Sequence, residues 1–182
     1  MVGAGKTSVA RKASRACETP FRDSDALVSR IAGKPIAEIF SEDGEEAFRE
    51  LEHKVLSDLL SDTRQTIIST GGGVVLRADN RHLLNEHAVV LWLQADISSI
   101  AHHLSQSPNP RPLVPKGDVA EMEATLTRLQ DERHHLYKAV ADITLNVSQI
   151  GQSAAVEAVI ENVKSSKEIS RDVKSSKDMK DR

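Results

Sequence analysis

A short, almost unbroken apolar run at residues 88–93 is the feature that most constrains the fold of this 182-residue chain. The run Ala-Val-Val-Leu-Trp-Leu has no polar face, so a strand built from it must be buried on both sides, as in parallel sheets covered by helices. Further strand candidates stand at residues 20–22, 66–69 and 143–147. Between the candidates, residues 44–61 and 118–139 space apolar side chains three and four apart, which predicts amphipathic helices. The alternation predicts a three-layer α/β/α fold with a parallel sheet.

The composition is that of an ordinary globular domain. Hydrophobic residues make up 39% and charged residues 28%, and the net charge of −3 speaks against non-specific binding to nucleic acid. No apolar run reaches the length that a bilayer requires. The single cysteine, Cys17, excludes a disulfide within the chain. We therefore expect a cytoplasmic monomer with no nucleic-acid or membrane partner. The alternative is an organelle-targeting signal upstream of Met1.

Two segments depart from the regular pattern. The stretch 105–112 is too rich in proline for a helix or a central strand, so a loop is expected at about 105–118. The second segment, residues 164–182, repeats Lys-Ser-Ser-Lys among acidic residues and has almost no apolar side chains. It cannot bury enough surface to offset its ordering entropy. We expect one domain over residues 1–163 followed by a charged, disordered tail.

The N-terminal stretch contains the end of a phosphate-binding motif. Gly5, Lys6 and Thr7 match the Gly-Lys-Ser/Thr end of the P-loop pattern, and a helical stretch follows. In such a loop the backbone N–H groups surround phosphates, the lysine reaches the outer phosphates and the hydroxyl binds Mg²⁺. The tripeptide alone fits a helix N-terminus without a ligand equally well.

Two further motifs carry charge. Asp23 and Asp25 follow the strand candidate at 20–22, where two carboxylates two residues apart point into the ligand crevice of an α/β fold. A turn that caps a helix at 26–32 is the plainer explanation. Arg49 and Glu52 lie three residues apart on one helix, which also fits a surface ion pair.

Three further motifs complete the pattern. Residues 70–73 place three glycines after a strand, where a ligand meets bare backbone N–H groups, and a simple turn rarely needs three. Arg111 stands in the proline-rich loop, where a solvated charge is the alternative. Arg133 stands on a predicted helix, where an ion pair with Glu132 or Asp131 is the alternative.

In this order and spacing the motifs resemble those of the shikimate kinase family, which has a P-loop fold similar to that of nucleoside-monophosphate kinases. The similarity runs from Gly3 to about Val147. The Phe-Arg-x-x-Glu, Gly-Gly-Gly, Arg-Pro-Leu and Arg-x-x-Leu-Tyr elements separate it from gluconate and adenylate kinases. The resemblance implies phosphorylation of the 3-hydroxyl of shikimate by ATP with Mg²⁺, a chorismate-pathway step of aromatic amino-acid biosynthesis. A related small-molecule kinase such as a gluconate kinase, or a truncated or degenerate non-catalytic relative, is the alternative.

The resemblance also implies roles on the nucleotide side. The residues that would hold the phosphates of ATP are Gly3, Gly5, Lys6, Thr7 and Ser8. Lys6 would contact the β- and γ-phosphates and act in catalysis. Thr7 would hold Mg²⁺ directly, and Asp23 would hold it through water. Arg111 would be a lid arginine that closes over the transferred phosphoryl group.

On the substrate side, the resemblance implies that Asp25 binds the ring hydroxyls of shikimate and takes the proton from the attacking one. Arg49 and Arg133 would bind the substrate carboxylate. Gly72 and Gly73 would offer backbone N–H groups to the substrate.

One element of that family is missing from these 182 residues, namely the opening strand with the first glycine of the P-loop. In this fold it is the central strand of the sheet. Burying three or four of its side chains should be worth roughly 5–10 kcal/mol, against about 5–15 kcal/mol for a whole domain. We therefore expect an unfolded chain or a cleft in the sheet, and about ten further residues ahead of Met1 in the working protein.

Overall fold

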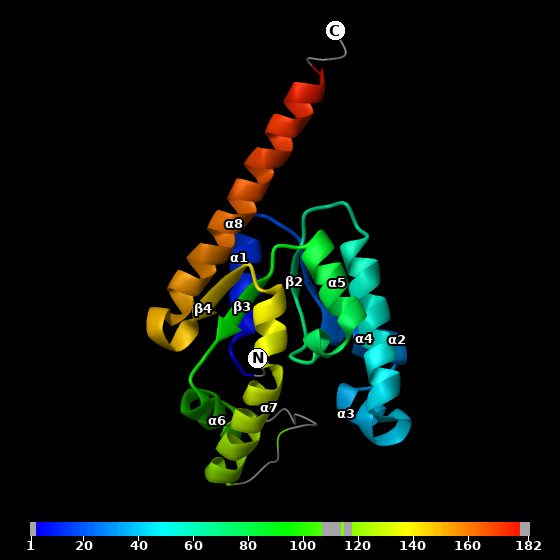
Figure 1. Cartoon of the computed structure of the whole chain (residues 1–182), viewed down its shortest axis with the longest axis vertical. Coiled ribbons are helices and arrows are strands. Elements are labelled where there is room, and N and C mark those ends of the chain that lie inside the picture. Colours follow the sequence, from blue (N-terminus) through cyan, green and yellow to red (C-terminus); the bar gives the residue numbers. More distant parts are fainter. Residues whose placement is uncertain (1–2, 107–113, 115–117, 179–182) are drawn as a thin grey trace.

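The computed structural model describes residues 3–106, 114 and 118–178, with side chains as far as Ser166. Helices and short parallel strands alternate along the chain (Figure 1). In chain order the elements are α1 (Lys6–Ala16), β1 (Phe21–Asp23), α2 (Ser24–Ala32), α3 (Ile36–Glu38), the π-helical turn η1 (Ile39–Asp43), α4 (Gly44–Leu60), β2 (Ile67–Ser69), the 3-10 turn η2 (Val74–Leu76), α5 (Ala78–His87), β3 (Leu91–Gln94), α6 (Ile97–Ser105), α7 (Val119–Val140), β4 (Ile143–Asn146) and α8 (Val147–Asp178).

The strands form two separate parallel pairs within the described residues. β1 pairs with β2 in the register Phe21↔Ile67, and β3 pairs with β4 in the register Leu91↔Ile143. The strands expected at 66–69 and 143–147 are confirmed to within a residue at each end. The strand expected at 88–93 begins later, at Leu91, because the Asp142 carboxylate accepts the N–H of Val90 at 2.7 Å just before the ladder starts.

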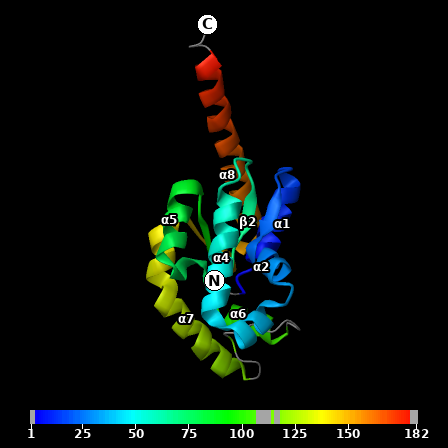
Figure 2. The same ribbon diagram turned by 90° about the vertical axis from the view of Figure 1, so that its right-hand side faces the viewer.

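Helices cover both faces of the strands, which confirms the α/β class with parallel strands. On one face, α1 and α8 pack together over β2, β3 and β4. On the other face, α4, α5 and α7 surround a core around Trp92, and Figure 2 shows this layer from the side. The first helix packs through its small side chains, because Val9, Ala10 and Ala13 are buried. The exposed residues of this helix include Arg11, Lys12 and Arg15.

A cavity of about 800 Å³ separates the two strand pairs. We call it the inter-strand cavity. β2 and β3 line its two sides, and side chains of α1 and α8 form its floor. The expected cleft in the sheet is therefore present at this position, between two folded halves.

Helix α8 has a kink at Gly151, where φ is 79°, and its first half packs against α1. Its far half projects away from the body in both views (Figures 1 and 2). Among the α8 side chains described, Val163 is the last buried one. The sequence predicts a disordered tail from Lys164 onward, whereas the backbone is helical as far as Asp178. The domain boundary at residue 163 stays a prediction.

Helix α6 ends at Ser105 and helix α7 begins at Val119. These positions are close to the limits expected for the proline-rich loop. Residues 107–113 and 115–117 lie outside the described residues, and Arg111 is among them. Within the described part of the chain, no helix has the length and apolar character needed to cross a membrane.

Candidate active site

The N-terminus of α1 forms the first part of the site. Gly5 caps this helix in the left-handed conformation with φ 77°, and Gly3 has φ 75°. Such angles suit glycine and strain other residues. The N–H groups in the first turn of α1 have no partners within the helix, and the helix dipole adds positive potential there. This helix end is therefore suited to bind phosphate, with Lys6 as its first residue.

A hydroxyl and a carboxylate meet beside this helix end. Thr7 Oγ1 donates to Asp23 Oδ2 at 3.0 Å and lies 3.1 Å from Ser69 Oγ. Asp23 Oδ1 accepts the N–H of Ala26 at 3.1 Å, so the expected helix cap is confirmed, although α2 already begins at Ser24. One aspartate thus caps α2 through one oxygen and contacts Thr7 through the other.

The pair of Thr7 and Asp23 fits Mg²⁺. This ion prefers oxygen ligands, keeps several waters and is commonly held by one or two protein groups together with substrate phosphates. Within the described residues there is no cluster of three or more His, Cys, Asp or Glu side chains that could hold a metal alone. A metal at this position would therefore depend on phosphate oxygens from the nucleotide.

The glycine run at 71–73 lies against charged side chains. A Cβ at Gly71 would come within 2.6 Å of Asp25 Oδ1 and 2.9 Å of Glu52 Oε1. A Cβ at Gly73 would collide with the guanidinium group of Arg49. The N–H of Gly71 donates to Ser24 Oγ at 3.3 Å. The absence of side chains lets Asp25, Glu52 and Arg49 approach the backbone closely.

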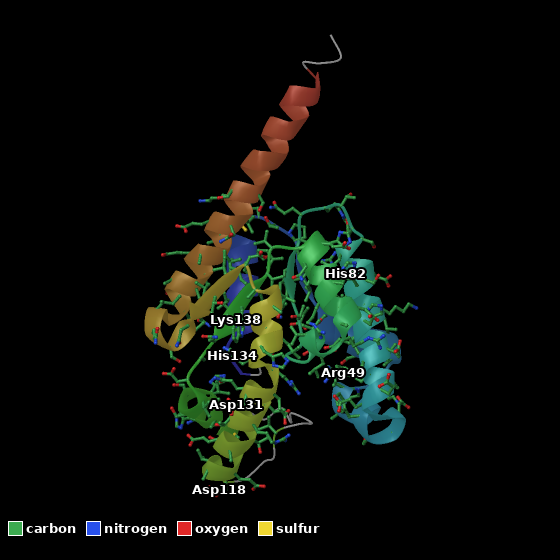
Figure 3. The ribbon with its side chains drawn as sticks, viewed as in Figure 1. Arg49, His82, Asp118, Asp131, His134 and Lys138 are labelled. Carbon is green, nitrogen blue, oxygen red and sulfur yellow. The ribbon has the colours of Figure 1, made fainter. Side chains whose placement is uncertain are left out.

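Arg49 is buried, with a relative exposure of 7%, on the side of α4 nearer to α7 (Figure 3). Its guanidinium donates to Glu52 Oε2 at 2.7 Å and to Glu45 Oε1 at 2.9 Å. It also lies over the ring of Phe48, 5.0 Å from the centroid. Because Glu52 is only 1% exposed, the alternative of a surface ion pair is wrong, and the pair belongs to the interior of the site.

Burial perturbs the ionisation of this pair. Burial raises the pKa of Glu52 above its ordinary range, the neighbouring Arg49 charge partly offsets this, and the negative charge of Asp25 adds to the increase. For Arg49, burial works against the charged form, but the charge and hydrogen bond of Glu52 raise the pKa of the guanidinium overall. Arg49 therefore stays charged, and a carboxylate beside it holds its proton more tightly than usual.

Arg133 lies on α7 and is 6% exposed. Its Nη1 donates to the carbonyl oxygen of Gly72 at 3.3 Å, and the hydroxyl of Tyr137 donates to the same oxygen. The surface-pair alternative for Arg133 is wrong, since Glu132 instead pairs with Arg128 at 2.9 Å. The Nε of Arg133 is buried and makes no hydrogen bond within the part of the chain described. A buried guanidinium with a donor left over is suited to receive an anionic ligand.

Several members of the site were not recognised as such from the sequence. Glu52 was visible only as a possible partner of Arg49, because helical spacing shows that two residues share a face but not that the face is buried. Tyr137 was seen only as the end of the Arg-x-x-Leu-Tyr element and Ser69 only as the end of a strand candidate, with no role in the site for either. Gln152 joins the site from α8, where its amide donates to Ser8 Oγ at 3.1 Å and accepts from Lys12 Nζ at 2.6 Å. Ser8 is therefore tied to α8.

The arrangement has two sides. The α1 helix end with Thr7 and Asp23 provides a place for phosphates and a metal, at the carboxyl ends of parallel strands where α/β folds bind ligands. The cluster of Asp25, Arg49 and Arg133 around the glycine run provides a place for a small anionic acceptor. Such a fold and site define a P-loop transferase that moves a phosphoryl group to a small molecule.

Comparison with known proteins identifies the family of P-loop transferases to which the chain is similar. The family model described as "Shikimate kinase" matches residues 2–164. The shikimate kinase of Caulobacter vibrioides is 39% identical over 160 residues, which cover 88% of this chain and 77% of that protein. The shikimate kinase of Gloeobacter violaceus is 38% identical over 159 residues, covering 87% of this chain and 86% of that protein. The structure of shikimate kinase from Acinetobacter baumannii in complex with shikimate superposes with a TM-score of 0.80 at 31% identity, over 91% of this chain and 89% of that one.

The chain belongs to the shikimate kinase family. It is thereby an ATP-dependent kinase that works with Mg²⁺, as the resemblance of its motifs led us to expect.

Proposed function

We propose that the chain transfers the terminal phosphoryl group of ATP to the 3-hydroxyl of shikimate. The observation that carries this proposal is the pair of buried guanidinium groups at the glycine run. Arg49 lies against Gly73 and Arg133 donates to the carbonyl of Gly72, while Asp25 lies against Gly71. Two buried arginines favour an acceptor with a carboxylate, because guanidinium and carboxylate groups pair through two parallel hydrogen bonds. Shikimate has one carboxylate and three ring hydroxyls.

In this proposal Arg49 and Arg133 bind the carboxylate and so fix the orientation of the ring. Asp25 then lies at the hydroxyl side, where its carboxylate hydrogen-bonds the attacking hydroxyl and accepts its proton. Gly72 and Gly73 offer backbone N–H groups to the substrate. Glu52 is not assigned a direct contact, since its hydrogen bond to Arg49 at 2.7 Å holds that guanidinium in place.

The nucleotide would be held by Gly3, Gly5, Lys6 and Ser8 at the start of α1. Lys6 would neutralise charge on the outer phosphates, and Thr7 with Asp23 would hold Mg²⁺. Bound Mg²⁺ supplies charge neutralisation for the transferring phosphoryl group. Arg111, which lies outside the described residues, is proposed to close over the same group and to exclude water.

We also propose that the chain acts as a monomer in the cytoplasm, on small molecules and not on nucleic acid. A net charge of −3 supports the last point, because nucleic-acid binding relies on basic surface.

The direct test is an assay that couples ADP release to NADH oxidation, with Mg²⁺, ATP and shikimate. We expect ADP release that depends on shikimate and is absent with gluconate, which separates the proposal from a gluconate kinase. A chain that is folded by circular dichroism but releases no ADP with shikimate would refute the proposal. If shikimate raised the melting temperature of that inactive chain, a ligand-binding, non-catalytic relative would be the better description.

A further inference from the structure

The start of helix α5 holds the turn that follows the glycine run. Asn80 donates through Nδ2 to the carbonyl oxygen of Val74 at 3.0 Å. Its neighbour Arg81 donates through Nη1 to the carbonyl oxygens of Val75 at 2.7 Å and Leu76 at 3.0 Å. Two consecutive side chains of α5 therefore bind all three carbonyl groups of η2, the turn that comes directly after the glycines.

Asn80 is fully buried, with a relative exposure of 0%, although its side chain is polar. A buried amide is costly unless its polar atoms are hydrogen-bonded. Because a carbonyl oxygen can only accept, the Nδ2 side of the amide faces Val74, and Oδ1 faces the Nδ1 atom of His53 at 2.7 Å. Oδ1 carries no proton, so His53 donates to it from Nδ1. The orientation of the asparagine is therefore fixed by two different elements.

Capping of its own helix does not explain the position of Asn80. Asparagine near a helix start commonly caps that helix. The N-cap residue of α5 is Arg77, which makes no side-chain cap hydrogen bond, and Asn80 lies three residues further on. The hydrogen bonds found for the Asn80 side chain go to η2 and to α4. Its burial therefore serves a connection between elements.

The partners of Asn80 form a closed circuit with Arg49. His53 lies four residues after Arg49 on α4, so the two side chains share a face of that helix. From His53 the hydrogen bonds lead through Asn80 to Val74. Val74 is covalently joined to Gly73, which lies against the guanidinium group of Arg49. The circuit thus ends on the helix where it began, about one turn away.

Helices α4 and α5 pack side by side along this circuit (Figure 1). At an exposed edge, Arg77 after η2 also pairs with Glu50 of α4, and exposed pairs of this kind contribute little. The hydrogen bonds of Asn80 are buried, where water does not compete with them and the low dielectric strengthens them. Asn80 is therefore the stronger constraint on where the turn lies relative to α4.

We propose that Asn80 is a positioning residue for the acceptor: by linking α4 to η2, it keeps the backbone of Gly73 in a fixed place relative to the Arg49 guanidinium. The inference rests on the proposed function, in which Arg49 binds the substrate carboxylate while Gly72 and Gly73 offer N–H groups. Groups that bind one small ligand together need a fixed spacing, and a shift of about 1 Å is enough to impair catalysis. Asn80 acts only through these groups.

Steady-state kinetics of Asn80→Ala separate positioning from general destabilisation. The KM for shikimate should rise about 5–30-fold. The KM for ATP should stay within about twofold, because the nucleotide side at α1 lies outside the circuit. Leu84→Ala is the matched control, since Leu84 is buried on the same helix and packs in the apolar core around Trp92. It should lower the melting temperature without a comparable rise in the KM for shikimate. An unchanged KM in Asn80→Ala, or an equal rise in Leu84→Ala, would overturn the proposal.

The α4 end of the circuit is tested through His53, which is half-buried. His53→Ala leaves the bond of Asn80 to Val74 in place and should raise the KM for shikimate about 3–10-fold. His53→Asn returns a donor close to the position of Nδ1 and should recover part of that loss. Lys54→Ala, at the exposed neighbouring position of α4, should have no effect. If Asn80→Ala does not fold, these variants still decide, and a His53→Asn variant no better than His53→Ala would contradict the hydrogen-bonded link.

Hydrogen exchange tests the turn without catalysis. The N–H of Leu76 donates to the carbonyl of Gly73 at 2.9 Å, so its exchange rate reports whether η2 is formed. In Asn80→Ala this amide should exchange at least about tenfold faster, and Leu84→Ala, which leaves both bonds of Asn80 intact, should change the rate less. If the parent chain released no ADP with shikimate, the proposed function would fall, and the exchange rates would still decide the role of Asn80. An unchanged rate at Leu76 in Asn80→Ala would refute that role, whatever the acceptor.

Discussion

Replacing Glu52 by alanine tests how the interior of the site is held together. Its Oε2 accepts from Arg49 Nη1 at 2.7 Å, and the two side chains are 1% and 7% exposed. Removing one partner of a buried ion pair leaves an uncompensated charge, which costs about 3–5 kcal/mol. Glu45, half exposed, would be the remaining ion-pair partner among the contacts found for Arg49. Glu52→Gln keeps the shape and one acceptor, so it should cost about 1–2 kcal/mol.

Thermal unfolding followed by circular dichroism measures the difference. For a chain of this size each kcal/mol changes the melting temperature by about 2–4 °C, so Glu52→Ala should lower it by roughly 6–20 °C. Glu50→Ala is the matched control on the same helix, because Glu50 forms an exposed pair with Arg77 and such pairs contribute about 0–1 kcal/mol. If Glu52→Ala melts within 2 °C of the control, the pair does not stabilise the site as argued.

The same residue gives the stability a pH dependence of known sign. Burial raises the pKa of Glu52 above its ordinary value of 4.5, so the folded state holds this proton more tightly than the unfolded chain does. The contribution of Glu52 is therefore largest below the unfolded pKa and declines as pH rises from there through the folded pKa. Glu52→Gln removes this decline. A Glu52→Gln variant whose stability follows the same pH profile as the parent would contradict a raised pKa.

Four further outcomes are expected of the site. Asp25→Asn should lower kcat by about 10²–10⁴-fold with the shikimate Kd changed only a few-fold, in steady-state and calorimetric measurements, and intact turnover would exclude Asp25 as the base. Arg133→Ala should raise the Kd for shikimate about 10–100-fold, and Arg133→Lys should recover only part, because lysine lacks the planar fork. Chelation by EDTA should abolish ADP release and excess Mg²⁺ should restore it; activity that persists without metal would refute the assignment of Thr7 and Asp23. Gly73→Ala should raise the KM for shikimate and lower the melting temperature, because its Cβ collides with the Arg49 guanidinium, and an unchanged KM would show that Arg49 moves aside freely.

Much of the fold could be predicted because its signals are local. The helix of residues 44–61 and the strands near 67 and 143 follow from periodicity and apolar runs, and they appear within about a residue of the expected ends. The strand at 88–93 was placed too early, since an apolar run does not show where ladder hydrogen bonds begin. There the N–H of Val90 donates instead to the side chain of Asp142, which is 52 positions further along the chain.

Site residues could be predicted where a short motif pairs a residue type with a known chemical role. Lys6, Asp25 and Arg133 were found from motifs, and the structure places them at the ends of the strands or against the glycine run; their roles in catalysis and binding stay predictions. Contacts made by helices from far along the chain could not be found. Tyr137 reaches Gly72 across 65 positions, and Gln152 reaches Ser8 across 144. Such contacts depend on how whole helices pack, which no local pattern encodes.

The hydrogen bonds of Arg133 and Tyr137 to the carbonyl of Gly72 tie two residues of α7, one helical turn apart, to the glycine run. Arg133 is 15 residues from the N-cap Asp118, which is about 22 Å of helix. If the helix pivots where it touches Gly72, a tilt of about 5° displaces its N-terminal end by about 2 Å. With such a pivot, a ligand that displaced Arg133 would also move the start of α7.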